Sequence, residues 1–185
     1  GLPFAGDALL LVYRTGLVGV QTNWVRWDAG YRLPTEAEWE KAARGGVANH
    51  RFPWSDSDEI QHARANYYSS SLYAYDTSPT RNYHPTYATG GNPYTSPVGS
   101  FAPNGYGLCD MSGNVWEWCW DWYGSSYYSS SPGTDPRGPV SGSGRVGRGG
   151  NWYDYAYGCR VASRMNVMPD GEINDVGFRA VLPPQ

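Results

Sequence analysis

Long apolar runs are missing from this sequence, and its longest one, near residues 8–13, is far below the roughly 20 residues that a membrane-spanning helix needs. Lysine is nearly absent, because Lys41 is the only one. The formal net charge is -3, and the arginines form no basic stripe. Nucleic-acid binding requires such a positive surface. The sequence therefore predicts no direct membrane span and no nucleic-acid partner.

Closely spaced cysteine pairs are missing as well, since Cys109, Cys119 and Cys159 lie far apart. A zinc ribbon is excluded because it needs two such pairs. One disulfide with one free thiol and three free thiols both remain open. We expect Cys109 to be a small core residue.

Glycine, proline, serine and tyrosine are abundant, whereas helical patterns are few. A chain of 185 residues is long enough for one domain with a real core. Short strands between long loops are typical of such a composition. The longest irregular stretches are residues 52–103 and 124–144, and segments 9–13, 20–27 and 176–182 are predicted strands. We expect an α+β fold with low secondary-structure content.

Residues 115–122 predict a strand with a heavily aromatic face. Its tryptophans recur at every second position, as Trp116, Trp118, Trp120 and Trp122. Such a face buries a large area, so we expect it to be core. Glu117 and Cys119 point the other way. Glu117 and Asp121 have the spacing of a catalytic carboxylate pair, but salt bridges are favoured, with the partners Arg148, Arg160, Arg164 and Arg179.

Residues 33–46 predict the one secure helix. Thr35 and Glu38 have the spacing of a capping box, with Thr35 as the N-cap. Glu40 and Arg44 are spaced for an ion pair one helical turn apart. The two glycines after Arg44 are typical of a helix end.

Five blocks, in this order, resemble the formylglycine-generating enzyme family, also called sulfatase-modifying factors. They include Asn-Gly-Tyr-Gly-Leu at 104–108, Arg-Gly-Gly at 148–150 and Gly-Phe-Arg at 177–179. The others are residues 31–46 and 111–118. The resemblance implies a variant of the C-type lectin fold over residues 1–185 as a single domain. It also implies that the family's N-terminal part, before about residue 31, is reduced or missing.

The family's enzymes oxidise a substrate cysteine with two cysteines that bind copper. The resemblance places Asp154 and Cys159 at those two positions. A carboxylate cannot replace a thiolate as a ligand for Cu(I). We therefore expect no copper, no catalytic residues and no enzyme activity. The alternative is the family's copper-dependent oxidase acting on sulfatase cysteines.

Within the family, the chain most resembles the variable proteins of diversity-generating retroelements. Their segment between Arg-Gly-Gly and Gly-Phe-Arg is diversified at asparagine codons and binds ligands. Here this implies a binding segment at about 151–168 for a protein or other macromolecule. Its predicted contact residues are Tyr153, Asp154, Tyr155, Tyr157, Gly158, Ser163, Met165, Asn166, Val167 and Met168. A fixed structural or interaction module is a further alternative.

Tyrosine chemistry favours binding independently of the family. Tyrosines supply large, rigid contact area, and serine, glycine, asparagine and aspartate adapt their hydrogen bonds. If Trp152 points inward, a regular strand turns Tyr153, Tyr155 and Tyr157 outward. In the other interpretation these tyrosines pack on the tryptophans of 116–122. We expect them to be exposed.

Asn66 matches a calcium-binding asparagine of the family, and Asp76 is a candidate carboxylate for the same site. Asn114 and Glu117 could serve a second ion, since Ca²⁺ takes oxygen ligands. Ordinary loop hydrogen bonding is the alternative for all four residues.

The family blocks that hold Cys119 and Cys159 adjoin, so a disulfide between them and two buried thiols are equal alternatives. We expect a monomer displayed at a cell surface or outside the cell.

Overall fold

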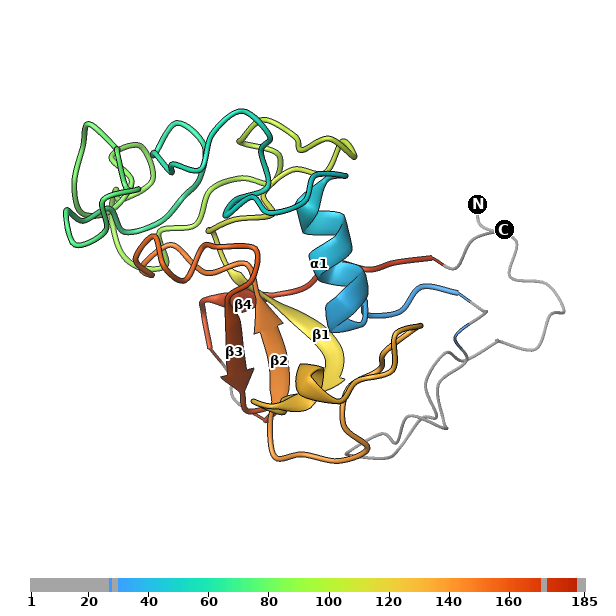
Figure 1. Cartoon of the computed structure of the whole chain (residues 1–185). Coiled ribbons are helices and arrows are strands. Elements are labelled where there is room, and N and C mark those ends of the chain that lie inside the picture. The colour runs from blue at the N-terminus through green and yellow to red at the C-terminus, as the bar shows by residue number, and fades with distance from the viewer. Residues whose placement is uncertain (1–26, 28–29, 171–172, 183–185) are drawn as a thin grey trace, which may run out of the picture.

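The computed structural model describes residue 27, residues 30–170 and residues 173–182. Within these ranges the chain forms one α-helix and one four-stranded sheet, joined by long loops (Figure 1). In chain order the elements are α1 (Glu36–Arg44), β1 (Trp116–Trp122), the 3-10 helix η2 (Tyr127–Ser129), β2 (Arg145–Arg148), β3 (Arg164–Val167) and β4 (Val176–Gly177). The predicted α+β class is confirmed. The strand expected at 9–13 and nearly all of the one at 20–27 lie outside the described residues.

The helix α1 forms where its local signals predict it. Thr35 is the N-cap: its side chain accepts the N–H of Glu38, and the Glu38 carboxylate accepts the N–H of Thr35. Glu40 and Arg44 form the expected ion pair at 2.7 Å. Gly45 ends the helix with φ at 56°, a conformation that favours glycine. In the described part of the chain, no helix is long and apolar enough to cross a membrane.

The sheet has the strand order β3-β2-β1-β4. β2 pairs antiparallel with β1 and β3, whereas β4 runs parallel to β1. The closing strand predicted at 176–182 is shorter, because its pairing with β1 ends at Gly177. Further along, Val181 leaves the sheet and pairs with Arg32 through two backbone hydrogen bonds of 2.9 and 3.1 Å.

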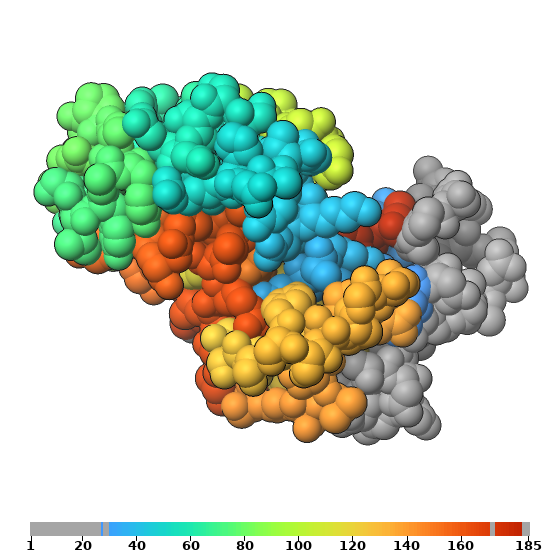
Figure 2. Space-filling view, in the orientation of Figure 1, coloured from blue at the N-terminus to red at the C-terminus, as the bar shows by residue number. Residues whose placement is uncertain are grey.

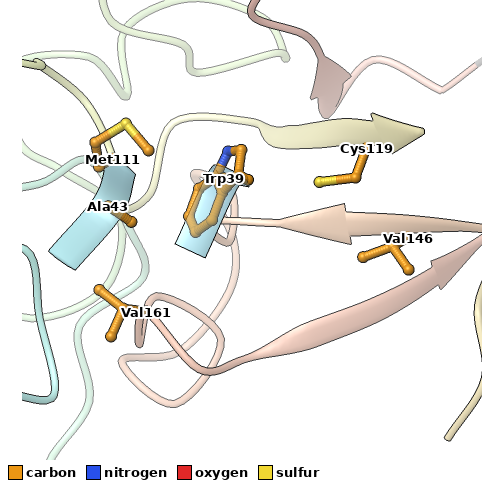
Figure 3. Packing of buried hydrophobic residues seen from close by; sticks show 6 residues of the cluster. All are labelled: Trp39, Ala43, Met111, Cys119, Val146 and Val161. Carbon is orange, nitrogen blue, oxygen red and sulfur yellow. The ribbon is translucent and has the colours of Figure 1, made fainter. Parts of the chain in front are cut away.

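Both sides of β1 are buried. Trp116, Trp120 and Trp122 are buried as predicted, whereas Trp118 is only half-buried. Cys119 lies on the opposite side of β1 and belongs to the main hydrophobic cluster, because the apolar face of α1 packs against that side. Figure 3 shows the members of this cluster, which are Trp39, Ala43, Met111, Cys119, Val146 and Val161. The expectation that the core lies at the tryptophan face is therefore incomplete.

Residues 52–103, which we call the excursion, contain no helix and no strand of the sheet. They fold around a second hydrophobic cluster made of Phe52, Ile60, Ala65, Tyr67, Ala156 and Cys159. Two of these residues come from the segment between β2 and β3. Figure 2 shows that segment lying against the excursion. The second cluster thus fixes the excursion onto the C-terminal part of the chain.

All three cysteines are free thiols. Cys119 belongs to the main cluster and Cys159 to the second, so the disulfide alternative is not realised. Cys109 is only half-buried, which corrects its assignment to the core.

Candidate functional site

Residues 151–163 connect β2 to β3 through a series of turns rather than a regular strand. The exposed fractions of Tyr153, Tyr155 and Tyr157 are 45%, 45% and 53%. Trp152 and Ala156 are buried between them. The predicted exposure of the tyrosines is confirmed, but it arises from turn geometry and not from strand alternation.

The start of this loop is built around Asn151. Its side-chain oxygen accepts the N–H groups of Tyr153 and Asp154 at 3.0 and 2.8 Å, which fixes the first turn. The preceding Gly150 has φ at 79°. A Cβ atom on Gly150 would lie 2.9 Å from the carbonyl carbon of Gly158. Glycine at this position therefore lets the backbone at the start of the loop approach the backbone of its middle part.

Arg148 holds the other end of the loop. Its side chain is fully buried and donates to the carbonyl oxygens of Ser163 and Val161 at 2.9 and 2.8 Å. The same guanidinium pairs with Glu40 of α1 at 2.5 Å. Arg148 thus ties the loop to the helix, in agreement with its expected structural role.

Tyrosines of the excursion extend the exposed surface. The backbone N–H of Tyr68 donates across to the loop at 2.9 Å, and its ring meets the edge of Tyr155 at 5.4 Å. Tyr73 stacks on Tyr157 with ring centroids 6.2 Å apart. We call the surface formed by Tyr68, Tyr73, Tyr153, Tyr155 and Tyr157 the tyrosine face.

Sequence reasoning missed Tyr68 and Tyr73 as parts of the candidate site. A signal was present, because long irregular loops in compact domains are often functional and this one is rich in tyrosine and serine. Its packing partner was not predictable, since the contact joins segments about 85 residues apart.

Other predicted contact residues do not lie on the tyrosine face. Three are buried, namely Gly158, Ser163 and Val167. Three more lie on β3 or just after it: Met165, Asn166 and Met168. β3 runs away from the loop at 151–163 toward the other end of the sheet, so these three residues are separated from the tyrosines (Figure 1). The expectation of one continuous contact segment is corrected accordingly.

Asp154 turns its side chain toward the protein. Its carboxylate accepts the N–H of Asn151 at 3.2 Å and a hydrogen bond from the Trp116 side chain. Burial raises the pKa of Asp154 to about 6, although both hydrogen bonds oppose the rise. Asp154 therefore stabilises the loop from its inner side, whereas the neighbouring tyrosines face outward.

A copper site of the kind implied by the resemblance needs two accessible thiolates. Asp154 supplies a carboxylate at one of the two positions. Cys159 occupies the other, but its side chain is fully buried and burial raises its thiol pKa well above the ordinary value. Cys119 lies in the other cluster and cannot complete the pair. These residues do not fit a copper–thiolate pair.

Of the predicted calcium ligands, only Asn66 and Asn114 are brought together. The amide nitrogen of Asn66 lies 3.3 Å from the amide oxygen of Asn114. The Asn66 oxygen is buried and has no hydrogen-bond partner in the described part of the chain. Asp76 lies elsewhere, since it pairs with Arg81 at 3.1 Å and accepts the Tyr67 hydroxyl at 2.6 Å. No group of three or more His, Cys, Asp or Glu residues suited to a metal occurs in the described ranges.

Glu117 and Asp121 are structural carboxylates. Glu117 pairs with Arg179 at 2.5 Å, as expected, and accepts the indole N–H of Trp39 at 2.6 Å. It is therefore occupied and separate from the two asparagines. Asp121 differs from the expected salt bridge, because it accepts the backbone N–H of Glu36 at the start of α1.

The fold is similar to that of a solved structure, Treponema denticola variable protein 1. The two share 37% sequence identity with a TM-score of 0.69, over 87% of this chain and 51% of that chain. This likeness confirms the predicted C-type lectin-like α+β fold and the resemblance to variable proteins.

Two curated relatives are named formylglycine-generating enzymes. The protein from Streptomyces coelicolor is 44% identical over 85% of this chain and 48% of its own length. The protein from Thermomonospora curvata is 42% identical over 84% of this chain and 50% of its own length. This chain therefore spans about half the length of the curated relatives it matches.

These relatives correct one prediction. The conclusion that the chain is not an enzyme is wrong as drawn, because proteins this similar are named as enzymes. A poor fit to copper does not establish that activity is lacking. The sulfatase-modifying factor enzyme 1-like domain matches residues 20–183. The chain therefore belongs to the family of sulfatase-modifying factor enzyme 1-like domains.

Proposed function

We propose that this chain is a variable protein of the diversity-generating retroelement type that binds a macromolecular partner through the tyrosine face. One observation carries the proposal: the exposed Tyr155 and Tyr157 meet the half-buried Tyr68 and Tyr73 of a distant segment on one surface, above a loop whose backbone is fixed at both ends. The likeness to a variable protein supports the same conclusion.

The tyrosine face has the physical features of a rigid binding surface. Tyr73 stacks with both Tyr75 and Tyr157, at 5.4 and 6.2 Å, so these rings support one another before any partner arrives. The hydroxyl of Tyr153 donates to Asp175 at 2.9 Å, which also limits its motion. Pre-ordered side chains lose little entropy on binding. Aromatic area at low entropic cost is what binding loops of other proteins use.

The division between buried and exposed positions suits diversification. Tyr153, Tyr155 and Tyr157 project outward, and exchanging them leaves the loop's internal hydrogen bonds to backbone atoms and Asn151 in place. The buried residues between them support the turns. A loop of this kind can change its contact chemistry without losing its shape.

The proposal is tested by a variant in which Tyr153, Tyr155 and Tyr157 are replaced by serine. Both proteins are screened against an array of purified surface proteins and glycans, and hits are measured by surface plasmon resonance. We expect binding to the wild type that the triple variant loses. The matched control replaces three other exposed tyrosines with serine: Tyr31, Tyr106 and Tyr128. Equal binding by both variants would contradict the proposal.

The names of the relatives support a second candidate, a cysteine-oxidising enzyme acting on sulfatases. A peptide containing Cys-x-Pro-x-Arg is incubated with the protein, with and without added copper, and analysed by mass spectrometry. Conversion that Cys159→Ala abolishes would establish this candidate. An unchanged peptide mass under both conditions would remove it.

We further propose that the binding protein works as a monomer at a cell surface or outside the cell, where the tyrosine face can meet a partner. A structural Ca²⁺ bound near Asn66 and Asn114 is part of the same proposal. Its support is the buried, unpartnered oxygen of Asn66, since oxygen atoms from loops are what Ca²⁺ takes as ligands.

A further inference from the structure

A second site lies beside the tyrosine face. A pocket of about 470 Å³ opens between the C-terminal end of α1, the segment 48–51 and the turn at 160–162. Three arginines line it: Arg44, Arg51 and Arg160. The pocket also contains His50 and a single acidic residue, Asp58.

Two of these arginines have no counter-ion among the residues that the structure describes. Arg51 donates to the backbone carbonyl of Asp58 at 2.8 Å and lies over the ring of Tyr75 at 4.4 Å. Arg160 donates to the carbonyl of Tyr157 at 3.1 Å and lies over that ring at 3.8 Å. Neither guanidinium forms an ion pair with any carboxylate in the described part of the chain. Each retains donors that are free to meet a ligand.

The positive charges of Arg51 and Arg160 both act on Tyr75. Burial raises the pKa of Tyr75, and the charges of Arg160 and Arg51 both oppose that rise. The backbones are also joined, since the N–H of Val161 donates to the carbonyl of Arg51 at 2.9 Å. Arg51 and Arg160 therefore lie in the same part of the pocket wall, where both positive charges attract an anion.

The remaining charged groups of the pocket wall determine its net charge. Arg44 is already paired with Glu40 at 2.7 Å. Asp58 uses one carboxylate oxygen to accept the N–H of Arg51 at 2.7 Å and lies 3.4 Å from His50. The Nδ1 atom of His50, which faces that oxygen, is buried and makes no hydrogen bond with any described residue. Three arginines facing one aspartate leave the pocket positive.

We propose that this pocket binds a phosphate or sulfate group, held between the guanidinium groups of Arg51 and Arg160 with His50 as a further donor. Guanidinium groups match the oxygens of such tetrahedral anions, and charge-assisted hydrogen bonds are stronger than neutral ones. The pocket adjoins the tyrosine face, because the Arg160 guanidinium lies over the ring of Tyr157, but anion binding does not depend on the function proposed for that face.

The test is a calorimetric titration of the protein with inorganic phosphate and, separately, with inorganic sulfate at low ionic strength. We expect saturable binding of at least one anion, weakened about tenfold or more by Arg160→Gln. Asp58→Asn should strengthen binding about threefold to tenfold, because it removes the opposing charge and keeps the oxygen that Arg51 needs. Arg137→Gln is the matched control, since it removes a charge at another place, over the Trp27 ring.

The two arms identify the anion. Binding of phosphate alone assigns the pocket to phosphate groups, and binding of sulfate alone assigns it to sulfate groups. Absence of saturable binding by either anion would overturn the proposal. So would equal weakening by the Arg160 and Arg137 variants, or unchanged affinity in Asp58→Asn, which does not disturb the folded backbone.

Discussion

Asp121 lies below the first turn of α1, where its carboxylate accepts the N–H of Glu36 at 2.7 Å. Burial raises the pKa of Asp121 to about 7, and repulsion from the Glu36 carboxylate adds to the rise. The carboxyl group of an unfolded aspartate titrates near ~4. Between these values the folded state holds a proton that the unfolded state has lost. The stability contributed by protonated Asp121 is therefore complete below pH ~4 and is lost as the pH rises through 7.

This linkage predicts the effect of Asp121→Asn. Asparagine keeps an oxygen for the N–H of Glu36 but never acquires the buried charge. Relative to wild type, the variant should gain roughly 2–4 kcal/mol in the free energy of unfolding between pH 5 and pH 8. Urea unfolding at both pH values measures this difference. The exposed control Asp170→Asn should show no such gain. A pH-independent effect of Asp121→Asn would contradict the assignment.

Arg148 shows how much a single buried side chain can organise. It joins β2 to two carbonyls of the tyrosine loop and to Glu40 of α1. A lysine keeps the charge but lacks the planar fork that reaches all three partners. Arg148→Lys should lower the free energy of unfolding by about 2–4 kcal/mol.

Hydrogen exchange of residues 151–163 gives the matching readout for Arg148→Lys. The loop should lose protection in the variant relative to the rest of the sheet. Arg137→Lys, at an exposed cation–π contact, serves as the control and should change neither quantity. Unchanged loop protection in Arg148→Lys would show that other contacts hold the loop.

Among the helices and strands, the features that depend on residues close in sequence were predicted correctly. The capping box of α1 and the aromatic strand β1 rest on local spacing, and both formed. The cap predicts that Thr35→Ala lowers stability by about 1 kcal/mol, because the N–H of Glu38 loses its acceptor. Thermal unfolding measures the loss. Thr134→Ala, in an exposed loop, should have no comparable effect.

The contacts within the excursion could not be predicted, because its sequence shows no helical or strand periodicity. The spacing of Asp76 does not show that Arg81 and Tyr67, five and nine residues away, contact its carboxylate, so its assignment as a calcium ligand did not take these contacts into account. Tyrosine exposure was predicted correctly from strand alternation, although the loop is a series of turns around Asn151. The correct result depended on Trp152 being buried, which holds in either geometry.

The excursion is also where Ca²⁺ would act. Under the calcium proposal, millimolar Ca²⁺ should raise the Tm by a few degrees over that in EDTA, because binding to the folded state alone stabilises it. Asn66→Ala should abolish the response, since it removes the unpartnered oxygen. Asp76→Asn should retain the response, because Asp76 is engaged by Arg81. Equal Tm values in Ca²⁺ and EDTA would contradict the calcium proposal.

In the whole molecule, a small sheet and one helix support the excursion and the loop at 151–163, which meet at the tyrosine face (Figure 1). The hydrogen bonds of the loop involve mainly backbone atoms and inward-facing side chains. The tyrosines that face outward are therefore the positions where exchange costs the fold least. The residues that build the loop and the residues that contact a partner are therefore separate sets.

Deep sequencing of the corresponding gene region across a natural population tests this separation. We expect variation concentrated at the codons for Tyr153, Tyr155 and Tyr157. Arg148, Gly150, Trp152 and Cys159 should stay constant, because their side chains or close contacts build the frame. A uniform sequence, or variation spread equally over buried and exposed positions, would contradict it.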